Sequence, residues 1–178
     1  MKTTLHLVLS VAILAPQAQP GSLAPSSATP PDVVDRMLTM ARVGANDVVY
    51  DLGSGDGRIV IAAALKFGAR GVGVDIDPAL VGRAQADARA AGVADRVTFA
   101  VQDAMTVDVT PASVVTLYLL AASNAKLRPI LMKQLRPGAR IVSHNYPIGD
   151  WEPDQVDTFT DARGTTRTLF LWRIRPAP

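Results

Sequence analysis

The chain has 178 residues, of which 48% are hydrophobic and 19% charged, and its formal net charge at pH 7 is +2. This composition indicates one packed domain and excludes a disordered chain, and the nearly balanced charge is not that of a nucleic-acid-binding surface. Because the sequence contains no cysteine, a disulfide framework, a thiolate metal site and a cysteine nucleophile are excluded as well.

The first residues form a segment of their own. An apolar run over residues 5–15 follows a single lysine, and it is shorter than the roughly 20 residues that span a bilayer. It is typical of a secretory signal or membrane-targeting segment, with Ala18 a candidate cleavage position, although an ordinary first helix is the alternative. Residues 15–31 are rich in Pro, Ser and Ala and predict a linker. We expect a signal or targeting segment with its linker over residues 1–24 and the folded domain over residues 25–178.

This segment also bears on localisation. A targeting segment predicts a periplasmic, secreted or membrane-associated protein, and the cytoplasm is the alternative.

Helical and strand patterns alternate along the rest of the chain. Apolar periodicity and turn residues predict helices over residues 31–43, 58–68, 78–92 and 123–135. They predict strands over residues 47–53, 71–77, 96–104, 113–121, 137–145, 155–161 and 165–174. Strands that alternate with helices are joined by right-handed crossovers, so we expect an α/β, Rossmann-like, mostly parallel sheet of seven strands with helices on both faces. The last two strands alternate polar and apolar residues, which predicts an antiparallel pair at the carboxyl-terminal end.

A glycine-rich turn, "DLGSGDG", joins the first strand to the second helix. Its G-x-G-x-G spacing differs from the dinucleotide-binding and phosphate-binding loops. Gly53 permits a tight turn, Gly55 lets a ligand approach the main chain, and Gly57 lets the helix begin close to the strand. A turn without a ligand is the alternative for such a pattern, but ligands bind at this edge of open α/β sheets.

Three carboxylates lie where successive strands end. Asp51 ends the first strand, Asp75 the second and Asp103 the third. Asp75 can accept both hydroxyls of a ribose and Asp103 can accept from the exocyclic amine of adenine. A pyrophosphate does not suit these acids, because no lysine lies beside the loop to balance its charge. A ligand with a ribose, an adenine and a cationic centre does suit them, and S-adenosylmethionine is such a ligand. For Asp51 the alternative role is to stabilise the turn, and for Asp103 it is that of a surface acid.

The chain resembles the class I S-adenosylmethionine-dependent methyltransferases from about residue 30 to residue 172. The resemblance rests on "DLGSGDGRIVIAAA", "GVDIDPALVGRA", "VQDA" and "LRPGARIVSH". More narrowly, "TP" at Thr29 and Pro30, "VVTLYLL", and Trp151 after "PGARIVSH" resemble a small family of protein-lysine methyltransferases. The mitochondrial members of that family act on membrane proteins such as the c-subunit of ATP synthase. Its members usually carry aromatic and Pro residues before the Thr-Pro pair, where this chain has "PSSA".

This resemblance implies S-adenosylmethionine as methyl donor and no metal. The glycine loop and Asp51 would hold the methionine end, Asp75 the ribose, Ile76 the adenine face and Asp103 the adenine amine. The cofactor-binding residues expected from the resemblance are Thr29, Asp51, Gly53, Ser54, Gly55, Gly57, Asp75, Ile76, Asp103 and Ala104.

Methyl transfer is an in-line displacement, so the protein has chiefly to align the reacting groups and exclude water. A lysine nucleophile must lose its proton, and a dry pocket lowers its pKa. No dedicated base is evident, and the candidates are Tyr118, whose hydroxyl can orient an amine, and His144. A core tyrosine and a structural histidine are the alternatives for these two residues.

We expect a protein substrate, with membrane proteins among the candidates, and no nucleic acid, and the oligomeric state is open. A small-molecule methyltransferase and a non-catalytic binder of adenosine ligands are the alternatives. The absence of a lid domain favours an acceptor that protrudes from a protein.

Overall fold

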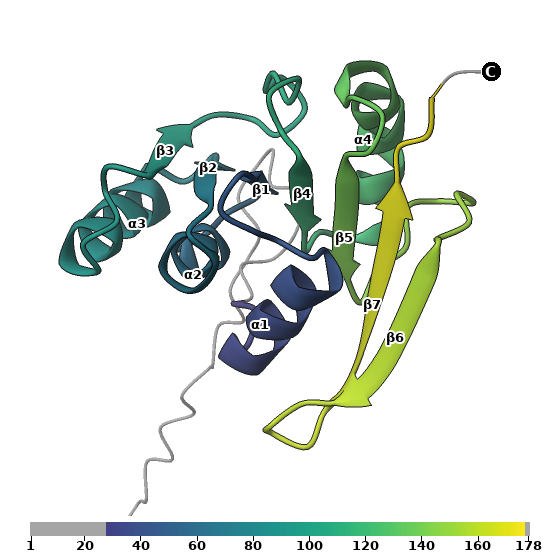
Figure 1. The fold of residues 1–178 in the computed structure, drawn as a ribbon, viewed down its shortest axis with the longest axis horizontal. Helices are drawn as coiled ribbons and strands as arrows, with labels where there is room; N and C mark the ends of the chain where they lie inside the picture. The colour runs from purple at the N-terminus through teal and green to yellow at the C-terminus, as the bar shows by residue number, and fades with distance from the viewer. Residues whose placement is uncertain (1–27, 177–178) are drawn as a thin grey trace, which may run out of the picture.

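The computed structural model describes residues 28–176, so the expected targeting segment and Ala18 lie outside the described residues. Seven strands form one sheet in the order β3-β2-β1-β4-β5-β7-β6 (Figure 1). The strands are β1 (Val48–Leu52), β2 (Arg70–Asp75), β3 (Val97–Val101), β4 (Val114–Leu117), β5 (Arg140–His144), β6 (Gln155–Thr160) and β7 (Thr166–Arg173). The first five run parallel, and β7 pairs antiparallel with both β5 and β6. The predicted α/β fold is confirmed, including its antiparallel carboxyl-terminal pair.

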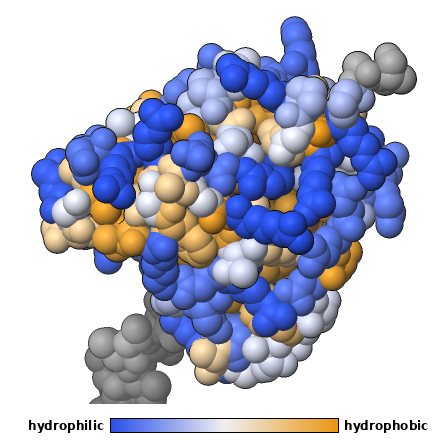
Figure 2. All heavy atoms as spheres, viewed as in Figure 1, coloured by the Kyte–Doolittle hydropathy of each residue, from blue (hydrophilic) through white to orange (hydrophobic). Residues whose placement is uncertain are grey.

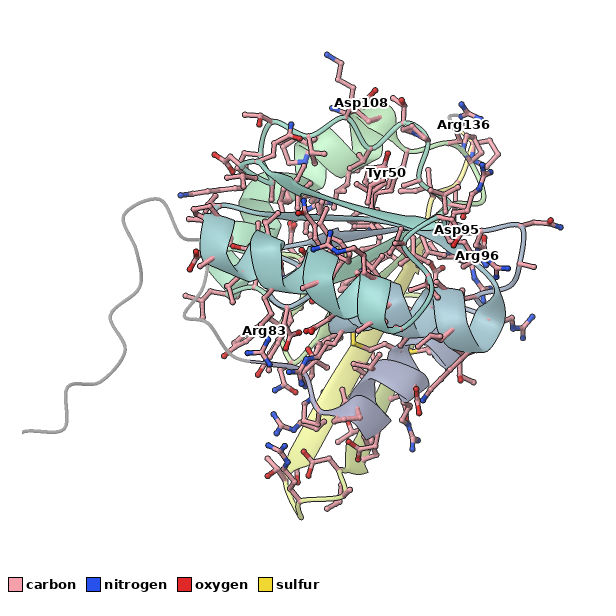
Figure 3. The ribbon with its side chains drawn as sticks, turned by 90° about the vertical axis from the view of Figure 1, so that its left-hand side faces the viewer. Tyr50, Arg83, Asp95, Arg96, Asp108 and Arg136 are labelled. Atoms are coloured by element: carbon pink, nitrogen blue, oxygen red, sulfur yellow. The ribbon has the colours of Figure 1, made fainter. Side chains whose placement is uncertain are left out.

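Helices cover both faces of the sheet. The helices are α1 (Pro31–Met40), α2 (Arg58–Phe67), α3 (Pro78–Ala90) and α4 (Ala121–Gln134). α1, α2 and α3 lie on one face and α4 on the other (Figures 1 and 3), and Figure 3 shows Tyr50 and Asp108 on the α4 side. None of the helices in residues 28–176 has the length and hydropathy that a membrane span requires.

Local sequence signals explain where the helices begin and where α2 ends. Pro31 and Pro78 occupy first positions, where a missing N–H costs nothing. Asp77 caps α3, since its Oδ1 accepts a hydrogen bond of 2.8 Å from the backbone N–H of Ala79. Gly68, with φ of 69°, ends α2 in the left-handed conformation.

Two large hydrophobic clusters lie above and below the sheet. On one face, Leu127 and Leu131 of α4 belong to a first cluster with strand residues that include Leu52, Leu117, Ile141 and Trp172. On the other, Val34 and Leu38 of α1 and Ile59 of α2 belong to a second cluster with strand residues that include Val49, Val142 and Leu169. Seen from outside, hydrophilic residues surround smaller groups of apolar ones (Figure 2). The strands therefore bury both faces, as their continuous apolar sequences predict.

Several element ends differ from the prediction. α1 stops at Met40, and Arg42 takes a φ of 51°, so the chain turns before Gly44. β4 ends at Leu117, because the apolar residues after it leave the sheet and Leu119 packs against the glycine turn. Apolar character alone does not distinguish a strand from the buried turn that follows it.

Candidate functional site

The parallel strands bring the predicted site residues to one edge of the sheet. β1 pairs with β2 and with β4, and β4 pairs with β5 in register, with Leu117 opposite Ser143. Asp51, Asp75, Tyr118 and His144 therefore lie at the carboxyl ends of four neighbouring strands. This is the edge at which open α/β sheets bind ligands.

The glycine turn uses each of its three glycines differently. Gly53, Gly55 and Gly57 have φ values of 84°, 54° and 76°, which favour glycine. A Cβ on Gly53 would lie 2.9 Å from the Leu119 side chain, and one on Gly57 would lie 2.6 Å from Phe99. A Cβ on Gly55 would meet nothing within 4 Å. Gly55 therefore lies beside open space that a ligand can occupy. At position 57 glycine is required because the Phe99 ring of β3 leaves no room for a Cβ.

Asp75 holds the turn in place. Its Oδ2 accepts a hydrogen bond of 2.8 Å from the Gly55 N–H, and its Oδ1 accepts one of 3.0 Å from the Asp77 N–H. A carboxylate has about four lone-pair sites, so two of them remain for a ligand hydroxyl. Asp75 is therefore both a candidate ribose acceptor and part of the loop's own framework, which its position in the sequence did not reveal.

Asp51 is a buried acid without a cation. The residue is only 3% exposed, and its Oδ1 accepts a hydrogen bond of 2.8 Å from the Thr116 hydroxyl. Burial raises the pKa of Asp51 to about 7; the Thr116 hydrogen bond opposes this rise, and the charges of Asp75 and Asp56 add to it. None of the ion pairs found in residues 28–176 includes Asp51. A ligand ammonium would supply the missing positive charge.

The residues before α1 close over the end of the turn. Thr29 is 4% exposed, and its carbonyl accepts a hydrogen bond of 2.9 Å from Arg58 Nη1. The same guanidinium binds Asp56 through Nε at 2.9 Å and Nη2 at 2.6 Å, and this lowers the pKa of Asp56. The buried Ser54 hydroxyl lacks a hydrogen-bond partner within the described part of the chain. This hydroxyl lies against β2, where a Cβ on Gly73 would be 2.7 Å from the Ser54 oxygen.

The remaining cofactor candidates follow β2 and β3. Asp103 is exposed, and its Oδ1 accepts a hydrogen bond of 2.9 Å from the Met105 N–H. Ala104 is buried and Ile76 is half-buried. These residues lie where the resemblance places the adenine, and their binding roles stay predictions.

The two catalytic candidates are in contact. The Tyr118 and His144 rings stack with their centroids 4.0 Å apart. His144 is fully buried, and neither ring nitrogen has a hydrogen-bond partner among the described residues. Burial, with the charge of Arg167, lowers the pKa of His144 to about 4, while Asp161 opposes that shift. His144 is therefore neutral at pH 7, and its burial favours the structural alternative over a role as base.

Sequence reasoning missed several residues of this edge. Thr116 lies on β4 two positions before Tyr118 and reaches Asp51, and a polar residue within the apolar run "VVTLYLL" was a signal that could have found it. Arg167 comes from β7, whose register cannot be read from the sequence, and its Nε lies 2.7 Å from Asp161 Oδ2. Arg58 and its contact with Thr29 were also not foreseen.

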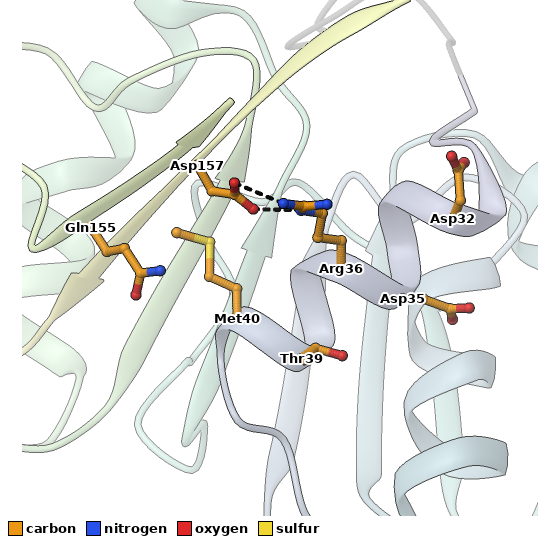
Figure 4. A pocket seen from close by; sticks show the side chains of 7 residues that line it. All are labelled: Asp32, Asp35, Arg36, Thr39, Met40, Gln155 and Asp157. Atoms are coloured by element: carbon orange, nitrogen blue, oxygen red, sulfur yellow. Dashed lines mark hydrogen bonds and ion pairs between the residues drawn. The ribbon is translucent and has the colours of Figure 1, made fainter. Parts of the chain in front are cut away.

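A groove of about 510 Å³ lies elsewhere, between α1 and β6 (Figure 4). Its lining includes three aspartates, and one of these, Asp157, binds Arg36 through Nε at 2.5 Å. No predicted site residue lines it. Within the described range, no cluster of three or more His, Cys, Asp or Glu side chains is arranged to hold a metal ion.

Proteins related to this chain in sequence are methyltransferases. A family model for the ANTKMT methyltransferase domain matches residues 51–155. A protein-lysine N-methyltransferase from Saccharolobus islandicus is 42% identical over 147 residues, which is 82% of this chain and 91% of that protein. A lysine N-methyltransferase of the ATP synthase c-subunit from Xenopus laevis is 33% identical over 142 residues, 80% of this chain and 61% of that enzyme.

One solved structure is similar over nearly its whole length. The crystal structure of an RNA methyltransferase from Salinibacter ruber in complex with S-adenosyl-L-homocysteine superposes with a TM-score of 0.80 at 52% identity. The match covers 85% of this chain and 96% of that one.

The raised pKa of Asp51 predicts how stability depends on pH. The ligand-free folded protein holds this proton up to about pH 7, whereas the unfolded chain releases it near the ordinary value of 3.8. Between these values the unfolded state binds fewer protons, so the free energy of unfolding falls as pH rises, by about 1.4 kcal/mol per unit at most. Asp51→Asn removes this contribution. Urea unfolding at pH 5 and pH 8 should show a smaller loss of stability in Asp51→Asn than in the wild type.

The matched control is Asp95→Asn, which changes an exposed aspartate and should keep the wild-type pH dependence. If Asp51→Asn and the wild type lose the same stability between the two pH values, Asp51 is not protonated in the ligand-free folded protein.

Proposed function

Because the chain belongs to the ANTKMT methyltransferase domain family, we propose that this S-adenosylmethionine-dependent methyltransferase transfers its methyl group to the amine of a protein lysine. The enzyme from Saccharolobus islandicus, which this chain matches over 91% of its length, is named for that reaction. The site supports the proposal because Tyr118, its candidate group for orienting an amine, lies at an edge that no additional domain covers in the described residues.

The edge of the sheet fits the methyl donor. The ammonium of its amino-acid end suits the buried Asp51 carboxylate, which has no cation of its own. The open space at Gly55 suits the approach of a polar group to the turn. The two remaining acceptor sites of Asp75 suit ribose hydroxyls. When bound, the cofactor supplies a methyl group made electrophilic by its sulfonium.

The chain's own residues bind, orient and exclude water. Asp51 and the glycine turn hold one end of the donor. Residues at the ends of the neighbouring strands β4 and β5 then set the position of the acceptor relative to the methyl group. Tyr118 lies directly after β4, the strand that pairs with β1, and we assign its hydroxyl to the orientation of the acceptor amine. The amine must be neutral to react, and a dry pocket lowers the pKa of a lysine by desolvation.

RNA is the strongest alternative acceptor. The solved Salinibacter ruber protein, 52% identical to this chain, is described as an RNA methyltransferase. The formal charge of this chain is only +2, which is small for a protein that binds a polyanion. A small-molecule acceptor and a non-catalytic binding domain are two further hypotheses, and one labelling experiment separates all four.

The purified protein should transfer labelled methyl groups to protein in a cell lysate. Incubation with a labelled methyl donor is followed by separation into protein, RNA and small metabolites, and by amino-acid analysis of the protein. We expect methylated lysine in the wild type and much less in Asp75→Asn, which weakens a charge-assisted contact. Label confined to RNA or to metabolites would contradict the lysine proposal, and tight donor binding without any transfer would indicate a binding domain.

Tyr118→Phe should lower turnover more than donor affinity. Loss of the hydroxyl removes a hydrogen bond, so kcat should fall about tenfold, while the Kd for S-adenosylhomocysteine from calorimetry should stay within about twofold. A kcat equal to that of the wild type would assign Tyr118 to packing alone.

We also propose that residues 1–24 direct the domain to a membrane or the periplasm, where a membrane protein would be its substrate. The name of the Xenopus laevis relative, which acts on the c-subunit of ATP synthase, supports this choice of substrate. The methyl donor is made in the cytoplasm, which favours an uncleaved anchor over export. Thr29 is buried in the domain, so any cleavage must fall before it.

Deletion of residues 1–24 should therefore leave folding and S-adenosylhomocysteine binding unchanged, while the full chain fractionates with membranes or periplasm. Recovery of the full chain in the soluble cytoplasm with Met1 retained would contradict the targeting proposal. Loss of folding on deletion would instead make the apolar run part of the core.

A further inference from the structure

Three adjacent strands bring polar side chains together beside the proposed acceptor position. In the register of β4 and β5, Tyr118 comes next to His144, and β5 pairs with β7 so that His144 lies opposite Leu169. Arg167 precedes Leu169 by two positions, and strand side chains alternate, so Arg167 points to the same face as His144. Tyr118 and His144 thus lie side by side, and Arg167 lies on the same face two residues from Leu169 along β7, past the end of β5.

We propose that Arg167 is a positioning residue that acts through Tyr118: its guanidinium, held by Asp161, fixes the Tyr118 hydroxyl where it receives the acceptor amine. This proposal rests on the lysine methyltransferase function proposed above. It assigns a role in the reaction to the carboxyl-terminal hairpin, which lies far from the glycine turn in sequence.

The hairpin holds Arg167 rigidly. Arg167 Nε donates to Asp161 Oδ2 at 2.7 Å, and the Asp161 side chain is fully buried. Asp161 Oδ1 also accepts hydrogen bonds from the backbone N–H groups of Arg163 at 2.9 Å and Thr165 at 2.8 Å. The Arg167 side chain is 16% exposed. The backbone of residues 163–165 therefore fixes the Asp161 carboxylate, and this carboxylate fixes the Arg167 guanidinium.

The Tyr118 ring is held from two sides. Its face stacks on His144 at 4.0 Å between centroids, and its hydroxyl lies near enough to Arg167 to help raise the pKa of that guanidinium. Asp161, and to a smaller extent this Tyr118 contact, raise the pKa of Arg167. His144 is buried and its lowered pKa keeps it neutral at pH 7, so it offers Tyr118 an uncharged surface. Ring and hydroxyl are thus both fixed before any acceptor arrives.

This arrangement leaves the hydroxyl able to bind an amine. A phenol oxygen has two lone pairs and one O–H. Arg167 donates to one lone pair, so the other can accept an N–H of the neutral lysine amine. That hydrogen bond directs the nitrogen lone pair away from the phenol. The lone pair forms the new N–C bond as the S–C bond breaks with its electrons remaining on sulfur, and the proton released by the amine goes to water.

A double-mutant cycle tests whether Arg167 acts through the hydroxyl. Arg167→Met and Tyr118→Phe should each lower kcat for a lysine peptide about tenfold, and the double variant should fall no further. The Kd for S-adenosylhomocysteine should stay within about twofold in all of them. Arg167→Lys keeps a donor at that place and should recover part of the loss. Arg163→Met removes an exposed arginine of the same turn and should keep wild-type turnover.

Additive losses of about a hundredfold in the double variant, or a loss in Tyr118→Phe alone, would overturn the positioning role. Urea unfolding of the same proteins tests the contact between Arg167 and Tyr118 independently of enzyme activity. Non-additive changes in the unfolding equilibrium constant are expected, and additive ones would overturn the contact. If the wild type transfers no methyl to lysine, the proposed function fails and the positioning role with it, while coupling in unfolding would still report the contact.

Discussion

The site depends on one carboxylate that is buried before its counter-charge arrives. β1 lies in the middle of the parallel strands, so the residue at its carboxyl end has a neighbouring strand on each side and little contact with water. Asp51 has a single side-chain hydroxyl as partner there, and the neighbouring acids make its ionisation harder still. This environment favours a ligand that carries a positive group, and the folded protein loses stability as the pH rises toward neutral. This is a local conflict between stability and binding of the kind found at functional sites.

The rest of the edge divides into two halves around this carboxylate. On the side of β2, Asp75 ties the glycine turn to the next strand and leaves Gly55 beside open space, so this half presents backbone and carboxylate to a ligand. On the side of β4, Tyr118 stacks on His144 and Arg167 is held by Asp161, so this half presents aromatic and guanidinium groups to the edge. We interpret the first half as the donor site and the second as the acceptor site. Arg167 lies in the second half because β7 runs antiparallel to β5. If β7 ran parallel to β5, its carboxyl-terminal end would reach this edge and Arg167 would lie at the opposite edge.

The sequence allowed the fold and one half of the site to be predicted, for a specific reason. In a parallel sheet, every residue at the carboxyl end of a strand reaches the same edge, so Asp51 and Asp75 could be placed together from the positions of their strands alone. Arg167 could not be placed in this way, because its position depends on the register of an antiparallel pair, which no local pattern in "TTRTLFLWRI" specifies. The close contact of Gly57 with Phe99 was missed for another reason, because it joins elements that are not consecutive in the chain. Boundaries failed where Leu119 continues an apolar run outside the strand.

The pKa of Asp51 in the ligand-free and the bound protein is the most direct test of this account. It can be followed by the carboxyl carbon resonance in protein labelled with ¹³C at aspartate, titrated with and without saturating S-adenosylhomocysteine, which retains the ammonium. The account predicts a pKa of about 7 in the ligand-free protein, as burial without a cation requires, and a clear fall once the ammonium pairs with the carboxylate. An Asp51 that titrates near 3.8 in the ligand-free protein and does not shift on binding would contradict it.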